Sequence, residues 1–266
     1  MRKSLVSVAV LGALALSNAA IAADVAPAAP AAAPAPAYTV SYNVGLYSQY
    51  IFRGLTQTDE KPSIQGGVDF AHASGFYLGA WGSNISWLED GAYYNNSSLE
   101  LDVYGGYANT IGATGLGYNV GLLQYIYPGK DISATYVNAE TTEVYGALSY
   151  KWLQAKVSVV VSDGAFANAN SDGTYYAELN ANVPLADSGV TANLHVGRQE
   201  YTGSLAGVSN DIYSYTDWKV GVTKAFSNGV NVGAYYTDSN AKDGGYTLLG
   251  KNIGDSTFTA FVQKTF

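Results

Sequence analysis

The feature that most constrains this chain is an alternation of apolar and polar residues with a period of two. In residues 38–53 the even positions carry mainly Tyr, Val, Leu and Phe, and the odd positions are mostly polar. Such a pattern indicates a β-strand whose two faces lie in different environments. The alternation returns along the chain and predicts twelve strands: 38–53, 64–70, 76–84, 99–107, 116–122, 143–150, 154–162, 175–183, 190–196, 217–223, 230–236 and 256–266.

Two of these segments do not reveal which face is apolar. In 76–84, either Tyr77 and Trp81 or Phe76 and Leu78 can point outward, and the register of 154–162 is open in the same way. In the other segments one face carries the apolar residues, so the register follows from the sequence.

The connections between the strands alternate between short and long. Pro62, Pro128 and Pro184 lie at strand ends or in loops, as a sheet requires. Short turns at one end and long loops at the other predict an all-β, up-and-down antiparallel meander. Short turns are expected near 73–75, 108–115, 152–153, 185–189 and 227–229, and long loops near 54–63, 85–97, 128–139, 163–173, 198–212 and 238–255.

A soluble β-sandwich would alternate as well, but the apolar faces favour a transmembrane barrel. The expected strands are about ten residues long, whereas strands usually have about five or six. Aromatic belts at both ends of an aliphatic band are typical of an outer-membrane β-barrel, and the sheet must close because lipid offers no hydrogen bonds. The expected belts are Tyr38, Phe76, Tyr107, Trp152, Phe226 and Phe266 at the short-turn end, and Tyr50, Phe52, Tyr175, Trp218 and Phe258 at the long-loop end.

The two termini point to the same location. Arg2 and Lys3 precede a short apolar run, and Ala20-Ile21-Ala22 is a small-x-small cleavage site, so residues 1–22 are expected to be a signal peptide. Residues 23–37 are rich in Ala and Pro and are expected to form an extended periplasmic spacer. The barrel would span 38–266 in the bacterial outer membrane, in contact with lipid and lipopolysaccharide. Its last residue, Phe266, resembles the signal that the barrel assembly machinery reads.

Charge and composition exclude several classes of function. The formal net charge is −8, so nucleic acid is not an expected partner, because phosphate binding needs a basic surface. The chain has no Cys and two His, which argues against disulfides, thiolate sites and a transition-metal centre. We expect no cofactor and no metal.

Several motifs resemble the TorF family of porins over nearly all of residues 38–266. The resemblance implies a Gram-negative outer-membrane barrel with a pore function, and it implies no particular substrate. The motifs are YIFRGLTQ at 50–57, GFYLGAWGSN at 75–84, ELDVYGGY at 100–107, YIYPG at 125–129, TEVYGALSY at 142–150 and TDWKVGVTK at 216–224.

The polar faces carry charges that predict a wet or ion-paired interior. An ionised side chain on the lipid face is costly, about 2–4 kcal/mol for Arg or Lys at the midplane. We therefore expect a passive channel for small hydrophilic solutes with a weak cation preference. A closed structural or adhesion barrel is the alternative, because many Tyr also face inward. The expected pore-lining residues are Arg53, Glu100, Asp102, Glu143, Glu178, Asp217 and Lys219.

A lipid-modifying enzyme is a weaker alternative. His72 stands two residues before Ser74 at a short turn, a spacing that resembles the His and Ser of outer-membrane phospholipases. No Asn or acid is evident to orient the imidazole, as nucleophilic catalysis requires. His195 stands alone on a polar face and is expected to be a polar liner. We therefore expect no enzymatic activity.

Overall fold

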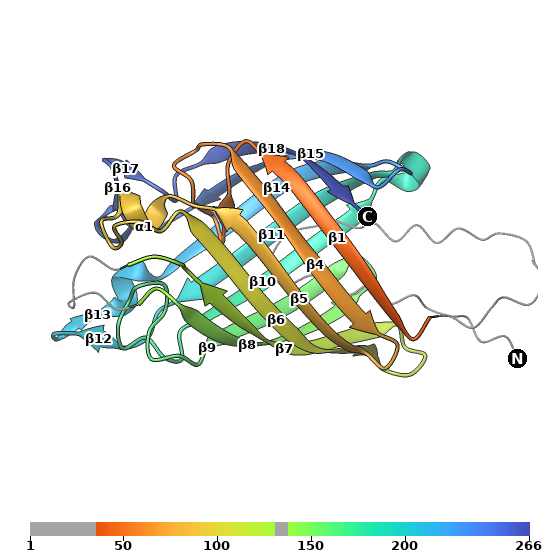
Figure 1. Cartoon of the computed structure of the whole chain (residues 1–266), viewed down its shortest axis with the longest axis horizontal. Coiled ribbons are helices and arrows are strands. Elements are labelled where there is room, and N and C mark those ends of the chain that lie inside the picture. Colours follow the sequence, from red (N-terminus) through yellow and green to blue (C-terminus); the bar gives the residue numbers. More distant parts are fainter. Residues whose placement is uncertain (1–35, 131–137) are drawn as a thin grey trace, which may run out of the picture.

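The computed structural model describes residues 36–130 and 138–266, and in these ranges twelve antiparallel strands close into a barrel (Figure 1). Each strand pairs with its neighbours in the chain, and the first pairs with the last. The wall consists of β1 (Tyr38–Tyr47), β4 (Ser63–His72), β5 (Phe76–Asn84), β6 (Leu99–Thr110), β7 (Leu116–Ile126), β8 (Thr141–Tyr150), β9 (Leu153–Val160), β10 (Tyr175–Pro184), β11 (Val190–Glu200), β14 (Tyr215–Ala225), β15 (Val230–Ser239) and β18 (Thr257–Thr265).

Closure depends on β1, which bonds to β4 on one side and to β18 on the other. The β1–β18 ladder runs from Asn43 opposite Thr265 to Tyr47 opposite Phe261. Beyond it, the Phe266 N–H donates to the Tyr42 carbonyl at 2.9 Å. No wall strand therefore keeps an open edge, which is the condition for a β-sheet in lipid. The fold predicted from the alternation is confirmed.

The two faces of the wall differ as the alternation predicts. Aliphatic side chains such as Leu46 and Leu122 are exposed on the outside, whereas Tyr104 and Tyr145 are buried inside. The two open registers are now fixed. Phe76 and Leu78 point outward with Tyr77 and Trp81 inward, and in β9 Ala155 and Val157 point outward while Gln154, Lys156 and Ser158 point inward.

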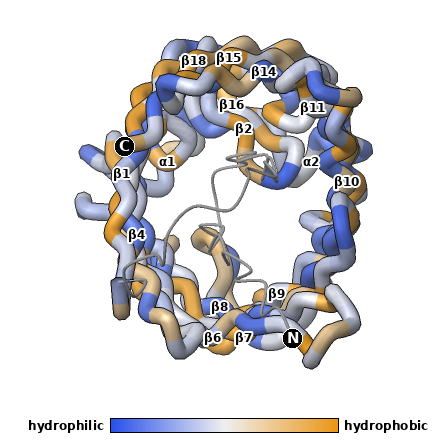
Figure 2. Tube along the Cα trace, turned by 90° about the vertical axis from the view of Figure 1, so that its right-hand side faces the viewer, coloured by the Kyte–Doolittle hydropathy of each residue, from blue (hydrophilic) through white to orange (hydrophobic). Residues whose placement is uncertain are grey.

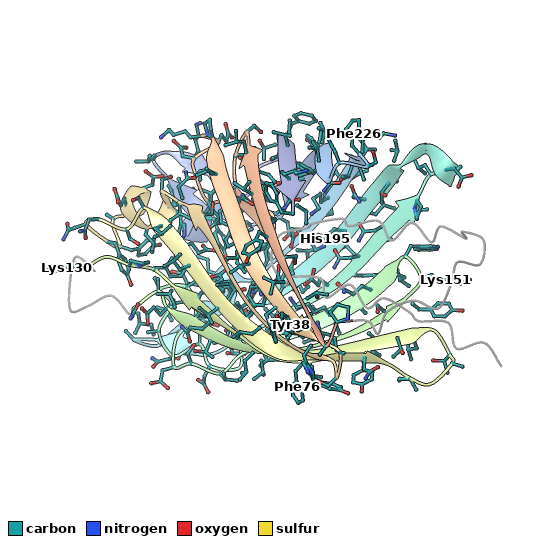
Figure 3. All side chains as sticks on the ribbon, turned by 45° about the vertical axis from the view of Figure 1, so that its right-hand side comes forward. Tyr38, Phe76, Lys130, Lys151, His195 and Phe226 are labelled. Carbon is teal, nitrogen blue, oxygen red and sulfur yellow. The ribbon has the colours of Figure 1, made fainter. Side chains whose placement is uncertain are left out.

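The two ends of the barrel are unlike, as Figure 1 shows. We call them the short-turn end and the long-loop end; Lys151 lies at the first and Lys130 at the second (Figure 3). Among the described residues, no helix is long and apolar enough to cross a membrane. The long loops carry α1 (Trp87–Asp90), α2 (Asp243–Tyr246), the 3-10 turn η2 (Asn210–Tyr213) and the hairpins β2 (Ile51–Phe52)/β3 (Leu55–Thr56), β12 (Ser204–Leu205)/β13 (Val208–Ser209) and β16 (Thr247–Leu248)/β17 (Lys251–Asn252), while η1 (Ala186–Ser188) forms a short turn.

The prediction of one strand over 38–53 is wrong at its end. The wall strand β1 stops at Tyr47, and the chain then forms the β2/β3 hairpin, which turns at Arg53 and Gly54 with φ of 47° and 80°. Two successive residues with positive φ reverse the chain direction, so the alternation continues while the strand does not. Figure 2, a view along the barrel, places β2 inside the outline of the wall.

This turn also corrects the aromatic belts. Tyr50 is buried, and the Phe52 ring packs against the rings of Tyr125 and Phe166, so neither residue belongs to the belt at the long-loop end. Tyr175, Trp218 and Phe258 do lie exposed on the outer face there. At the short-turn end, the exposed belt residues are Tyr38, Phe76, Trp152, Phe226 and Phe266.

The expected signal peptide and all but the last two residues of the expected spacer lie outside the described residues.

Candidate functional site

The seven charged residues expected in the pore all lie on the inside of the barrel. Six stand on wall strands and are placed there by the alternation, whereas Arg53 comes from the tip of the β2/β3 hairpin. Glu100 and Asp102 stand on β6, Glu143 on β8, Glu178 on β10, and Asp217 and Lys219 on β14, and all but Glu178 among these six are less than 9% exposed.

Arg53 is held in a cage of side chains inside the barrel. Its Nη2 donates to Oε2 of Glu143 at 2.8 Å, and its Nη1 donates to Oε1 of Gln199 at 2.9 Å. The guanidinium carbon lies 4.4 Å from the centre of the Tyr176 ring and 4.8 Å from that of Phe52. Ion pairing, hydrogen bonding and cation–π contact therefore all hold this one group.

Three carboxylates, Glu100, Asp102 and Glu143, form what we call the acidic cluster. Glu100 accepts a hydrogen bond from the Tyr50 hydroxyl at 2.8 Å, and Glu143 pairs with Arg53. Neither carboxylate oxygen of Asp102 has a hydrogen-bond partner among the described residues, although Asp102 is 0% exposed. Of the three carboxyl groups, Glu143 is the one that pairs with Arg53.

A second network lies beside the first and centres on His195, which Figure 3 shows between the two ends of the barrel. Its Nε2 is 3.0 Å from Oδ1 of Asp217, and its Nδ1 is 2.7 Å from Oδ1 of Asn180. The Tyr176 hydroxyl donates to the other oxygen of Asp217 at 2.8 Å. His195 is therefore part of a hydrogen-bonded network rather than an isolated liner.

The remaining inward charges are paired less closely. Lys156 Nζ lies 3.7 Å from Glu178 Oε1, and the sequence did not identify Lys156 because the register of 154–162 was open. Lys219 forms no ion pair with any described residue, and its ammonium lies 5.1 Å from the centre of the Tyr235 ring. Both cations lie over Tyr rings, since Lys156 Nζ is also 4.9 Å from the centre of the Tyr145 ring.

Toward the short-turn end the inner wall carries mainly amides, together with Asp69, which accepts a hydrogen bond from the Tyr104 hydroxyl at 2.6 Å. The Asn193 amide donates to Asn182 at 3.0 Å, and the Tyr77 hydroxyl donates to Asn119 at 2.7 Å. Such neutral polar groups offer hydrogen bonds to a solute without selecting its charge. Most of the inward charged residues therefore lie toward the long loops.

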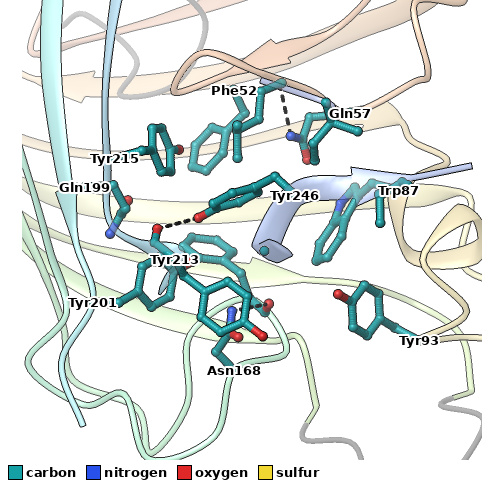
Figure 4. A pocket seen from close by; sticks show the side chains of 15 residues that line it. Phe52, Gln57, Trp87, Tyr93, Asn168, Gln199, Tyr201, Tyr213, Tyr215 and Tyr246 are labelled. Carbon is teal, nitrogen blue, oxygen red and sulfur yellow. Dashed lines mark hydrogen bonds between the residues drawn. The ribbon is translucent and has the colours of Figure 1, made fainter. Parts of the chain in front are cut away.

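An aromatic pocket with a cavity volume of about 60 Å³ opens among the long loops. The Tyr246 hydroxyl donates to the Tyr213 carbonyl at 2.5 Å, as Figure 4 shows. Burial raises the pKa of the Tyr246 phenol well above its ordinary value. None of the described Asp, Glu, Lys or Arg residues lines the pocket. Its aromatic lining is Phe52, Trp87, Tyr93, Phe166, Tyr201, Tyr213, Tyr215 and Tyr246, joined by the amides of Gln57, Asn168 and Gln199.

The pair of His72 and Ser74 lies at the opposite end, in the exposed turn between β4 and β5. His72 Nδ1 and Ser74 Oγ are 2.7 Å apart, and no described residue is hydrogen-bonded to Nε2 of His72. In residues 36–130 and 138–266, no group of three His, Cys, Asp or Glu is placed to hold a metal ion.

The chain belongs to a family of bacterial proteins of unknown function, Gcw_chp, whose family model matches residues 31–266. The name TorF, which the motifs suggested, is not confirmed by this match. The KdgM porin is similar in structure, with a TM-score of 0.52 and 9% identity over 85% of this chain and 99% of that chain.

The NanC porin is similar as well, with a TM-score of 0.50 and 11% identity over 86% of this chain and 99% of that chain. At such identities the likeness shows the fold alone, and that fold is the β-barrel of outer-membrane porins. No protein of curated function matches the sequence.

Proposed function

We propose that this member of the Gcw_chp family is an outer-membrane channel for passive diffusion of small hydrophilic solutes, with a weak cation preference. The observation that carries the proposal is the contrast between an apolar outer wall and an inner wall that holds charges. Ionised groups are tolerated in a membrane-spanning barrel only where they face the interior. Porins of the same fold support this assignment.

The expected preference for cations follows from the sum of the inward charges. Among the described residues, Asp69, Glu100, Asp102, Glu143, Glu178 and Asp217 oppose Arg53, Lys156 and Lys219, six acidic against three basic groups. A low-dielectric wall focuses the field of the excess charge, which enriches cations. Because Glu143 and Glu178 are paired, the preference should be modest.

The β2/β3 hairpin limits the conductance that we expect. It places Phe52 and Arg53 inside the barrel, against side chains of β7, β8, β10 and β11. The narrowest part of the proposed channel is therefore near the long-loop end. With that end facing outward, a peptide tag in 85–97 or 238–255 should be accessible on intact cells, and a tag at 227–229 should not.

Liposome swelling tests the channel directly. Liposomes that contain the purified barrel should swell in small sugars, amino acids and salts, at rates that fall steeply with the size of the solute. Liposomes without protein and liposomes with heat-denatured protein are the controls. Swelling at the rate of empty liposomes in every solute would contradict the proposal.

A closed structural barrel is the second candidate, because one buried cluster fills part of the interior. Tyr125 is 0% and Leu123 is 1% exposed there, and Tyr50, Tyr77 and Trp81 belong to the same cluster. This candidate predicts that Arg53→Ala, which removes the charge at the tip of the hairpin, does not increase the permeability of the membrane. The channel predicts that the same variant conducts more.

We further propose that the barrel is not an enzyme. The His72–Ser74 pair lacks an orienting group at Nε2 among the described residues, and such a group fixes the tautomer of a catalytic imidazole. The wild type should show no calcium-dependent release of fatty acid from phospholipid vesicles. Phospholipid hydrolysis by the wild type that is lost in His72→Ala would contradict this proposal and would indicate a lipase.

A further inference from the structure

The interior of the barrel holds a guanidinium that does not belong to the barrel wall. We propose that the lumen contains a binding site for small organic cations with a guanidinium or alkylammonium group, and that Arg53 fills this site as a tethered substitute for the solute. The inference rests on the proposed channel function and names the class of solute that the channel selects.

The cage around Arg53 has the parts that guanidinium recognition requires. The Glu143 carboxylate and the Gln199 amide oxygen accept hydrogen bonds from two different nitrogens of the fork, and the Tyr176 ring presents its face at 4.4 Å. A planar cation is held well by this combination of bonds and ring contact. Glu143, Tyr176 and Gln199 stand on β8, β10 and β11, so these parts of the cage remain when the hairpin moves.

No strand ladder joins the hairpin that carries Arg53 to the barrel wall. Its strands pair only through Ile51 with Thr56 and Phe52 with Leu55, in a small sheet separate from the barrel. Its backbone bonds to other long loops are few: the Thr56 N–H donates to the Ile253 carbonyl at 2.8 Å, and the Ser86 N–H donates to the Gln57 carbonyl at 2.8 Å. Because no ladder joins the hairpin to the wall, it can leave without breaking the barrel sheet.

Departure of Arg53 would leave the acidic cluster without its cation. Asp102 already lacks hydrogen-bond partners among the described residues, and each buried, unsatisfied carboxylate calls for a donor or a cation. The described Asp, Glu and His side chains are not placed to hold a metal ion. The N–H groups of an organic cation, spread over several ångströms, match Glu100, Asp102 and Glu143 better than a bare ion does.

The aromatic pocket provides the approach to this site. Phe52, Phe166 and Gln199 line the pocket, and the same three residues contact the Arg53 guanidinium. Aromatic faces attract a desolvated cation, while they offer little to an anion. The pocket and the cage of Arg53 thus share three residues, and a cation that enters from the long-loop end meets the rings first.

Calorimetric titration of the barrel in detergent at low salt tests the site, with agmatine as the probe because it carries both groups. Arg53→Gln removes the tethered competitor, whose effective concentration is in the millimolar range. We expect agmatine to bind this variant about tenfold tighter, or more, than the wild type. Arg53→Lys, which keeps the charge but loses the fork, should lie between the two and serves if Arg53→Gln does not fold. Heat-modifiable migration on a gel shows which variants are folded.

Matched second changes locate the site. Glu143→Gln in the Arg53→Gln background should remove the gain in affinity. Asp69→Asn in that background should retain the gain, because Asp69 accepts from the Tyr104 hydroxyl at 2.6 Å on β4, toward the short-turn end. Equal affinity of the wild type and both Arg53 variants, or equal losses in the two double variants, would overturn the inference.

The titration does not depend on conduction, so the two proposals fail separately. A barrel that conducts ions while no variant binds agmatine contradicts the site and leaves the channel. A barrel that binds agmatine as expected and conducts nothing supports the site and contradicts the channel. Glucose and glutamate, a neutral and an anionic probe, should give no heat of binding, and equal binding of either would overturn the selection of cations.

Discussion

Asp102 and Glu143 face the same interior, but their surroundings predict opposite responses to the loss of a charge. Glu143 pairs with Arg53 at 2.8 Å, so Glu143→Gln should lower the free energy of unfolding by about 3–5 kcal/mol, the usual cost of breaking a buried ion pair. Asp102 has no partner among the described residues, so Asp102→Asn removes an uncompensated charge and should stabilise the barrel by about 1–3 kcal/mol.

Urea unfolding of the refolded barrels in lipid or detergent measures both values. Glu60→Gln, on an exposed loop, is the control and should change the free energy of unfolding little. Destabilisation by Asp102→Asn comparable to that by Glu143→Gln would show that Asp102 has a partner that we have not identified. The expected increase in the free energy of unfolding of Asp102→Asn would mean that the carboxylate of Asp102 lowers the stability of the wild type.

Selectivity is the second property that single residues should control. Replacement of Glu100 by Gln and Asp102 by Asn removes two inward negative charges, so the reversal potential in a salt gradient should move toward anion preference. Arg53→Ala removes a positive charge and should move it the other way. Both shifts should shrink between 0.1 M and 1 M salt, because the screening length falls from about 10 Å to about 3 Å. Shifts of the same sign in the two variants would contradict the charge assignment.

Among the elements of the structure, the β2/β3 hairpin is the one that we expect to control conductance. Gly54 has a φ of 80°, and a Cβ at this position would lie 2.4 Å from Cβ of Asp217 on the wall. Gly54→Ala therefore strains the turn and meets the wall, so the inward position of the hairpin should become less populated. Planar-bilayer recordings should show a several-fold larger or more frequently open conductance than in the wild type.

The control for this variant is a glycine of similar conformation far from the lumen. Gly250 has a φ of 82° with open space around its Cβ, in the β16–β17 turn, so Gly250→Ala should strain a loop without altering conductance. Unchanged conductance in Gly54→Ala, together with normal assembly, would mean that the hairpin does not limit the flow.

The terminal strand is the second element that supports a prediction. Phe266 is 69% exposed on the outside, and its N–H donates to the Tyr42 carbonyl next to the closing ladder. Deletion of Phe266, or Phe266→Asp, should lower the yield of heat-modifiable barrel and leave protease-sensitive chain in the periplasm. Trp152→Asp, on the same exposed belt but in a turn, separates the loss of an aromatic group from the loss of the terminal signal. Equal assembly of all variants would remove the role of Phe266.

The wall strands could be predicted from the sequence because alternation reports directly on a two-faced sheet. The hairpin could not, because its residues keep the same alternation while Arg53 and Gly54 reverse the chain. Alternation records which side of the backbone is apolar, and it does not record whether that side meets lipid or the packed interior. Tyr50 and Phe52 were therefore assigned to the wrong surroundings.

At the scale of the whole molecule, the charges of the site could be predicted and their partners could not. Glu100, Asp102 and Glu143 follow from strand register, which is a local property. The contact of Arg53 with Gln199 joins residues 146 positions apart, and the pocket forms from five long loops whose spacing carries no periodic signal. The density of Tyr in and next to those loops, with Tyr201, Tyr213, Tyr215 and Tyr246 among them, was the available signal for an aromatic site.

The central claim is that this barrel conducts, and single-channel recording in a planar bilayer under a potassium chloride gradient tests it most directly. We predict a small conductance in the wild type, a reversal potential of the sign that marks weak cation preference at low salt, and a larger conductance in Arg53→Ala. No conductance in either protein, with both shown to be folded and inserted, would contradict the channel and leave the closed barrel. Clear anion selectivity would contradict the assignment of the inward carboxylates.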